Sequence, residues 1–388
     1  MLKKPELELI ITTYKARYFA TIKLKANMSD LDLNSLIRQV KTNCNISDAK
    51  FWGNYSICGL LLRLRELFRH ENRIMPWEEI SKTDISDWIS NRENLWHEKE
   101  NEDFVDLYFG EEEYPPFDVK AINESLGERG LVYGAGLGIN MKPSFFLGEL
   151  ISKEVMEGHE VYISGDEFAR DLSAYPAMLQ DNTIYARRDA LSIILYGRFE
   201  ELSLRKCSGA LSYAFADYGL HPGEQGSEAA YDKILKIMES ELDVYVHHEI
   251  GEAFEGKKLG SEWKNMLSVI QNRRVEFFIR GIKDVLSDTS EKGMIKYIIR
   301  KNNKGSLGFY ISFIGGFRKL IFPEIMNAFQ DFTGSEDWDL INETRKNGYI
   351  KAERLASRVL EIYGTPDDKT KLDELIEKEL IGKTTISR

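Results

Sequence analysis

The sequence predicts a mainly α-helical fold with a helical bundle-like architecture and a minor β component. Three observations support this prediction. Long segments carry apolar residues at helical spacing, few segments show the alternation of a strand, and only 9 prolines occur in 388 residues. The composition, 43% hydrophobic and 30% charged, is that of an ordinary globular protein.

Helical periodicity is the most frequent pattern along the chain. It predicts helices over 54–69, 186–204, 227–255, 263–286, 294–300, 306–317 and 354–363, and an exposed charged helix over 371–380. Ser227 suits the start of the third of these helices, and Gly256 suits the position just after its end. Strand patterns are rarer: 159–165 is the clearest strand, and 8–24 fits either a strand pair or a helix.

A charged segment with a proline pair, over 98–118, marks the best candidate domain boundary. It predicts an N-terminal helical lobe over 1–110, which need not fold independently, and a main helical domain over 119–388 that carries the candidate site. A long surface loop inside a single domain explains the same composition.

The charge and the cysteines limit the class of protein. A net charge of −11 argues against nucleic-acid binding, because no long basic patch is set apart from the acidic residues. The first residues lack the apolar core of a secretory signal, and no segment has the length of a membrane span. The three cysteines, Cys44, Cys58 and Cys207, are scattered and form no disulfide framework or zinc ribbon. We therefore expect a cytoplasmic protein with reduced thiols and no membrane partner.

The segment 245–252 carries the strongest chemical pattern of the chain. Within it, His248, Glu249 and Glu252 form the sequence H-E-x-x-E. On a helix His248 and Glu252 lie one turn apart on one face, where both can bind one metal ion, and Glu249 lies beside them to handle a proton. This is the zinc-protease pattern with glutamate in place of the second histidine. Glu276 or Asp284 is the candidate third ligand, and zinc, iron and manganese are the candidate metals.

A di-iron site in a helical bundle is less well supported. The spacing of His248 and Glu252 occurs in hemerythrin-like bundles, which need several more histidines from other helices, whereas ferritin-like sites need two E-x-x-H elements. The chain has 6 histidines and lacks that element.

A polar network without a metal explains the same residues. The face that carries His248 and Glu252 continues into apolar positions and is expected to turn inward. Buried carboxylates need partners, which arginines of neighbouring helices can supply. The predicted supporting network comprises Glu241, Tyr245, His247, Arg187, Arg188, Asp189, Arg273 and Asp284. Plain surface charge is the third alternative.

Two further segments, one rich in glycine and one rich in charged residues, are candidates for binding or for ion pairs. Gly134, Gly136 and Gly138, with the nearby Lys142, offer backbone amides and a charge to an anion, but the spacing matches no phosphate-binding motif and a turn before a helix near Pro143 is the favoured explanation. Acidic and basic residues are also concentrated over 165–172 and 187–189, where a buried ion-pair lattice among Glu167, Arg170, Asp171, Arg188 and Asp189 is expected.

Five stretches together resemble a family of bacterial proteins with no assigned function. They are 142–147, 167–172, 187–189, 248–252 and 280–289, so the resemblance covers most of the chain from Tyr133 onward. The resemblance implies a bacterial, cytoplasmic, helical protein. It implies no activity, cofactor or site.

Two functions remain open at this point. One is a metal-dependent hydrolase-like enzyme in which Glu249 activates a water bound to the metal. The other is a non-enzymatic helical binding or regulatory protein in which the same residues form a polar network. The H-E-x-x-E order favours the enzyme, and the scarcity of histidines favours the binding protein. The partner in either case is an unknown small molecule or a protein, and the oligomeric state is open.

Overall fold

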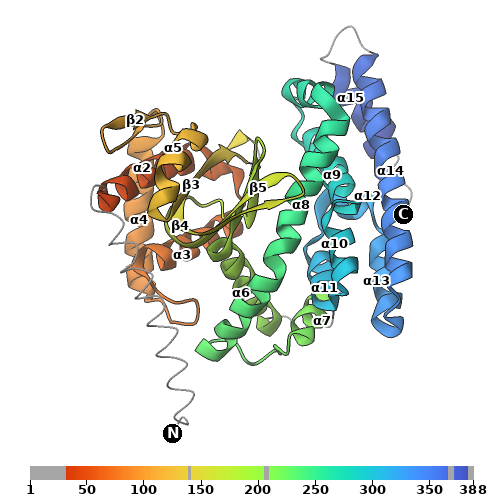
Figure 1. Ribbon diagram of the computed structural model, residues 1–388, viewed down its shortest axis with the longest axis horizontal. Coiled ribbons are helices and arrows are strands. Elements are labelled where there is room, and N and C mark those ends of the chain that lie inside the picture. The colour runs from red at the N-terminus through yellow and green to blue at the C-terminus, as the bar shows by residue number, and fades with distance from the viewer. Residues whose placement is uncertain (1–31, 139–140, 205–208, 366–370, 383–388) are drawn as a thin grey trace. The chain divides into compact units, whose positions relative to one another are not determined.

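A computed structural model describes residues 32–138, 141–204, 209–365 and 371–382, and the chain divides into two units (Figure 1). The first unit contains the described residues up to Glu154 together with Tyr162–Tyr175 and Arg187–Ala190. The second contains Val155–Val161, Pro176–Ala186 and the described residues from Leu191 onward. The segment 8–24, predicted as a strand pair or a helix, and Cys207 lie outside the described residues.

The helices of the first unit begin at residues that cap them. Asp32, Ser56 and Ser81 each accept a hydrogen bond from a backbone N–H three residues later, which satisfies a donor that the first turn leaves open. The helix predicted over 54–69 is confirmed as α3. The helical elements are α2 (Leu33–Phe51), η1 (Trp52–Asn54), α3 (Ile57–Asn72), α4 (Lys82–Lys99), α5 (Val119–Leu126) and η2 (Gly127–Arg129).

The β component is larger than the sequence predicted, so the fold is mainly helical but is not a pure bundle. A hairpin joins β1 (Leu107–Phe109) to β2 (Glu112–Tyr114), and a five-stranded sheet has the order β3-β4-β5-β7-β6. Its strands are β3 (Leu131–Leu137), β4 (Pro143–Met156), β5 (His159–Arg170), β6 (Ala177–Gln180) and β7 (Thr183–Arg187). The strand predicted over 159–165 is confirmed as part of β5.

The turn and helix expected around Gly134 and Pro143 are wrong, because both segments are strands. β3 pairs antiparallel with β4, with Tyr133 opposite Leu147. The first five residues of β3 and the first six of β4 are all buried, so their sequences lack the alternation that marks a half-exposed strand. Gly134 is needed in β3 because a Cβ there would lie 2.1 Å from the ring of Phe146.

The second unit is built on the long helix α8, which is green in Figure 1 and packs against α9 and α10. α9 packs in turn on α12 and α14, around a core that includes Phe278, Phe322 and Phe332. The helices are α6 (Arg188–Leu204), α7 (Ala210–Asp217), α8 (Glu228–Val269), α9 (Arg273–Thr289), α10 (Met294–Lys301), α11 (Lys304–Phe313), α12 (Gly316–Ile321), α13 (Glu324–Ser335), α14 (Trp338–Gly364), α15 (Leu372–Ile376) and the π-helical turn η5 (Glu377–Ile381).

The predicted start of α8 is confirmed and its predicted end is wrong. The Ser227 hydroxyl accepts a hydrogen bond from the N–H of Ala230, as an N-cap does. The helix continues past Gly256, and its backbone breaks only at Gly260, where φ is 72°. Among the helices of the described ranges, none has the length and apolar character needed to cross a membrane.

Candidate functional site

Two glycines bring α8 against the turn between α9 and α10. A Cβ at Gly251 would lie 2.5 Å from the carbonyl oxygen of Ser287, and one at Gly293 would lie 1.9 Å from the same atom. No side chain fits between these backbones, so glycine at both positions lets them meet. The close approach places His248, one turn before Gly251, beside the C-terminal end of α9.

His248 forms an ion pair with Asp288 in this position. Its Nδ1 lies 2.6 Å from Asp288 Oδ1, and the Asp288 side chain is completely buried. Burial of the ring favours the neutral form, but the neighbouring carboxylate outweighs this effect and raises the pKa of His248 to about 10. His248 is therefore an imidazolium at neutral pH, with its second ring nitrogen also protonated.

Arg318 of α12 adds a second cation. Its Nη1 lies 3.6 Å from Asp288 Oδ2 and its Nε lies 3.9 Å from Asp284 Oδ2. Both distances exceed a hydrogen bond, so these carboxylates offset the charge of Arg318 without engaging those donors closely. The buried hydroxyl of Tyr310 lies near the same carboxylates, and burial together with the charge of Asp288 raises the pKa of Tyr310.

A cavity of about 100 Å³ lies beside these cations, entirely within the second unit. Its polar lining comes from Glu241, Tyr245, His248, Ser306, Tyr310 and Arg318. Its apolar lining comes from Val244, Met294, Phe309, Phe313 and Ile314. α8, α10, α11 and α12 thus enclose a space with apolar walls and two cationic side chains.

Glu241 contributes a carboxyl group to the same cavity. One of its oxygens accepts hydrogen bonds from the Tyr218 hydroxyl at 2.7 Å and the Ser306 hydroxyl at 2.5 Å. Burial raises the pKa of Glu241 to about 7, although these two hydrogen bonds oppose the shift. The charge on this part of the lining therefore changes near neutral pH.

Glu249 and Glu252 have partners outside the cavity. The ammonium group of Lys283 forms a short ion pair with Glu252, and the Lys283 charge holds the pKa of that carboxyl below its usual range against the effect of burial. Glu249 accepts a hydrogen bond of 3.0 Å from the backbone N–H of Leu179. Burial raises the pKa of Glu249 to about 7.

Glu276, the proposed third metal ligand, lies far from His248. It is 12 positions before Asp288 on α9 and accepts a hydrogen bond from Arg280 at 2.8 Å. At 1.5 Å per residue, that offset is about 18 Å along the helix. The part of the chain that the structure describes contains no group of three or more His, Cys, Asp or Glu side chains arranged to hold a metal ion.

The predicted supporting network is brought together only in part. Glu241, Tyr245 and His248 share the cavity, and Asp284 faces Arg318. His247 points elsewhere: its Nδ1 lies 2.8 Å from the carbonyl oxygen of Asp243, and its ring stacks on Tyr297 with centroids 3.9 Å apart. Arg273 is exposed at the start of α9, where its guanidinium lies over the ring of Phe277.

Arg187, Arg188 and Asp189 belong to the first unit. Arg187 is fully buried there and forms an ion pair of 2.6 Å with Glu167, while Asp189 accepts a hydrogen bond from the Glu167 backbone. The ion-pair lattice expected among Glu167, Arg170, Asp171, Arg188 and Asp189 is therefore found only in part: Glu167 and Asp189 lie together, but Arg187 supplies the guanidinium that pairs with Glu167, and Arg170 donates to the carbonyl oxygen of Glu66. Half-buried Arg188 is the first residue of α6.

Lys142 forms ion pairs with carboxylates and is not part of a glycine loop that binds an anion. Its buried ammonium group lies 3.1 Å from Asp48 and 3.6 Å from Asp171. Both carboxylates favour its charged form and raise its pKa against the effect of burial. Lys142 thus extends the buried ionic cluster of the first unit, and the nearby glycines belong to or follow a strand, so the proposed anion loop is wrong.

The sequence did not identify Asp288, Lys283, Arg318, Tyr310 or Ser306 as site residues. Asp284 and Asp288 lie one turn apart on α9, which was the available signal for an acidic face opposite His248. Arg318 and Ser306 lie on separate helices and carry no local signal for this site.

Comparisons with known proteins find one family. The N-terminal domain of a family of unknown function, DUF6866, matches residues 35–187, and the C-terminal domain of the same family matches residues 192–382. The chain matches no curated protein and no solved structure. The expected resemblance to a family without an assigned function is confirmed.

Proposed function

We propose a function for this chain, which belongs to the DUF6866 family of unknown function, from the chemistry of its second unit. The cavity beside His248 and Arg318 binds a small organic carboxylate, and the protein acts as a binding or regulatory module. The observation that carries the proposal is that two cationic side chains line one small cavity whose other walls are largely apolar.

The charges beside the cavity favour an anion. His248 is positively charged at neutral pH because its pKa is about 10, and Arg318 is positively charged throughout the ordinary pH range. Asp288 lies against both cations, and Asp284 lies 3.9 Å from Arg318 Nε, so these two carboxylates offset much of the positive charge and the free N–H donors become decisive. The Nε2–H of His248 and the guanidinium of Arg318 then supply the charge-assisted hydrogen bonds that a carboxylate accepts.

The size of the cavity limits the ligand. An engineered cavity of about 150 Å³ holds benzene, so a space of about 100 Å³ suits a short-chain carboxylate. The aliphatic part of such a ligand would pack on Met294, Phe309 and Ile314, which line the cavity. These apolar contacts distinguish a carboxylate with a hydrocarbon tail from an inorganic anion.

A metal-dependent hydrolase is the second candidate, and two observations favour it. A carboxylate on Nδ1, as Asp288 provides, also orients histidines that bind metals through Nε2. Glu249 has a pKa of about 7, which suits a general base. Against it, zinc, iron or manganese would have to displace a proton held with a pKa of about 10, which costs about 4 kcal/mol at pH 7, and would have to separate Glu252 from Lys283.

Calorimetric titration of the full chain at pH 6 tests the carboxylate proposal. Acetate, propanoate and butanoate are the probes, and propanamide is the neutral control for propanoate. We expect propanoate to bind at least about tenfold more tightly than propanamide, because only the anion pairs with the two cations. Arg318→Gln weakens propanoate binding. Lys319→Gln, the matched control, removes an exposed charge at the next position and leaves the affinity unchanged.

Two results would reject carboxylate binding: no binding by any member of the series, or equal binding of acid and amide. Elemental analysis of the same protein, purified without a chelator or a histidine tag, tests the hydrolase. A stoichiometric metal that is lost in both His248→Ala and Glu252→Ala, with the fold intact, would favour the second candidate.

A further inference from the structure

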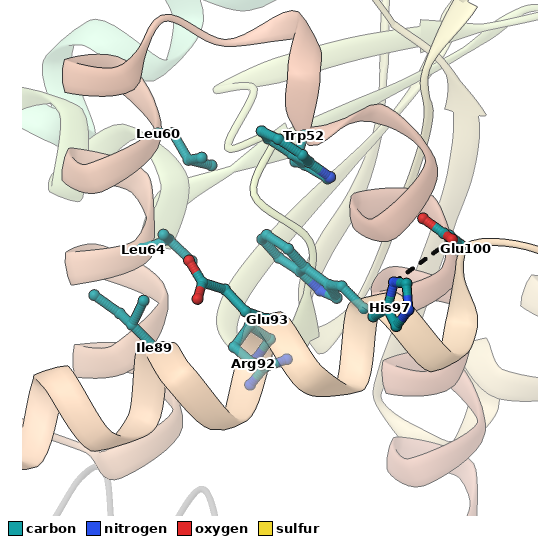
Figure 2. A pocket seen from close by; sticks show the side chains of 9 residues that line it. Trp52, Leu60, Leu64, Ile89, Arg92, Glu93, His97 and Glu100 are labelled. Carbon is teal, nitrogen blue, oxygen red and sulfur yellow. Dashed lines mark ion pairs between the residues drawn. The ribbon is translucent and has the colours of Figure 1, made fainter.

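The first unit contains a cavity of about 290 Å³, which is larger than the one beside His248 and plays no part in the carboxylate proposal (Figure 2). Trp52 of η1 forms one side of it, Leu60 and Leu64 of α3 form another, and α4 supplies the rest. We propose that this cavity is a binding site for a small organic cation that also carries a hydrogen-bond acceptor.

Aromatic rings supply the first argument. Trp52 and Trp96 both line the cavity. Trp52 is 49% exposed, and a ligand in the cavity would cover part of its ring. The face of an indole ring attracts cations, and quaternary ammonium groups are commonly recognised between such rings.

The charge of the lining supplies the second argument. Glu93 and Glu100 lie at the cavity and are exposed. Arg92 also lines it, but the guanidinium donates to Glu71 and Asn45, so its charge is already compensated. His97 also lines the cavity and lies 3.7 Å from Glu100, so Glu93 is the main carboxylate left for a ligand (Figure 2). The remaining charge is negative, which favours a cation and repels an anion. Figure 2 shows Glu93 and Glu100 on the α4 side of the cavity, with Trp52 on another segment.

A buried donor supplies the third argument. Trp96 is only 5% exposed, and its indole N–H has no hydrogen-bond partner among the described residues. An unpaired buried donor is unfavourable, and because this nitrogen is inaccessible to solvent, an acceptor on the ligand would satisfy it only after a small shift of the indole ring. The cavity therefore fits a molecule with an ammonium group on one part and a carbonyl or ester oxygen on another.

Acetylcholine and its neutral carbon isostere, 3,3-dimethylbutyl acetate, form a matched pair of probes for this site in the full chain. Both have the same shape and the same ester, and they differ in the positive charge. We expect acetylcholine to quench tryptophan fluorescence and to bind about ten- to thirtyfold more tightly than the isostere, because a desolvated cation–π contact contributes about that factor. Tetramethylammonium, which lacks the ester, binds more weakly than acetylcholine.

Variants locate the site. Trp52→Ala and Glu93→Gln each weaken acetylcholine binding by about tenfold, since both side chains are exposed and neither supports the core. Trp96→Phe removes the N–H and keeps an aromatic face, so it weakens acetylcholine binding by a larger factor than tetramethylammonium binding. Ile57→Ala is the matched control, because Ile57 is an exposed apolar residue of the same unit (79%) that does not line the cavity.

Three results would overturn the proposal. They are equal affinity for acetylcholine and its neutral isostere, no binding of either probe or of tetramethylammonium, and binding that survives both Trp52→Ala and Glu93→Gln. Calorimetry on the same variants separates loss of binding from loss of a fluorescent ring, which matters for Trp52→Ala and Trp96→Phe.

Discussion

Replacing Asp288 with asparagine tests whether this carboxylate keeps His248 positively charged. The pKa of His248 is about 10 in the folded protein, against 6.5 for an unperturbed histidine. Because the folded pKa is the higher one, the ion pair contributes its full stability below pH 6.5 and loses it as the pH rises toward 10. At about 1.36 kcal/mol for each pH unit, the complete contribution is about 5 kcal/mol, of which about 3 kcal/mol is lost between pH 6 and pH 9.

Urea unfolding at pH 6, 7.5 and 9 measures this loss. In Asp288→Asn the His248 pKa drops, since burial then favours the neutral ring, and we expect the pH-dependent loss to disappear. Asp331→Asn, an exposed position on α13, is the control and keeps the slope of the natural sequence. Histidine NMR, with His248→Gln for assignment among the 6 histidines, follows the ring directly. Titration of His248 near pH 6.5 in the unaltered protein, or the same slope in Asp288→Asn, would refute the reasoning.

Substitutions at two glycines of α8 and at Glu241 give further tests. Gly251→Ala places a Cβ 2.5 Å from the Ser287 carbonyl oxygen and should destabilise the protein by about 1–3 kcal/mol in urea unfolding. Gly256→Ala meets nothing closer than 3.9 Å and should stabilise the helix by up to about 1 kcal/mol, so a loss of stability in both variants would contradict the assigned close approach. For Glu241, whose pKa is about 7, deprotonation places a negative charge at the cavity, so propanoate affinity should fall by roughly tenfold between pH 6 and pH 8. Glu241→Gln should remove this dependence in calorimetry, and an unchanged pH profile would show that Glu241 does not face the ligand.

Helices with one apolar face could be predicted from the sequence because their signals are local. The periodicity over 186–204 and 294–300 corresponds closely to α6 and α10, and Ser227 caps α8 as its sequence position indicates. The end of α8 could not be predicted this way. Gly256 is compatible with both a helix interior and a helix end, and tertiary packing decides between them.

The sheet was harder to predict because β3, at its edge, and β4 both begin with residues that are all buried. The first parts of β3 and β4 lack alternation, and the glycines of β3 suggested a loop. Two glycines of this segment meet aromatic rings: a Cβ at Gly134, within β3, would meet Phe146, and one at Gly138, just after β3, would meet Tyr175. Both rings are contributed from elsewhere in the chain, so the reason for each glycine becomes visible only after folding.

The candidate site likewise combines features that local sequence spacing predicts with contacts that form only after folding. The sequence placed Tyr245 in the polar network expected around His248, and the structure shows that both side chains line one cavity. Helical spacing could not predict that Glu252, one turn further along α8, would lie outside that cavity and pair with Lys283. The partners of α8 come from positions 31 and 40 residues away, and a single sequence gives no measure of those distances.

The two functional hypotheses therefore require different states of two side chains, His248 and Glu252. A metal requires a neutral His248 and a free Glu252, whereas an organic anion requires a charged His248 and is indifferent to Glu252. α9 controls both conditions, because Asp288 holds the proton on His248 and Lys283 occupies Glu252. In the natural sequence this arrangement favours the anion. Asp288→Asn should weaken propanoate binding and lower the proton cost of metal binding together, so measuring both ligands on this one variant separates the hypotheses.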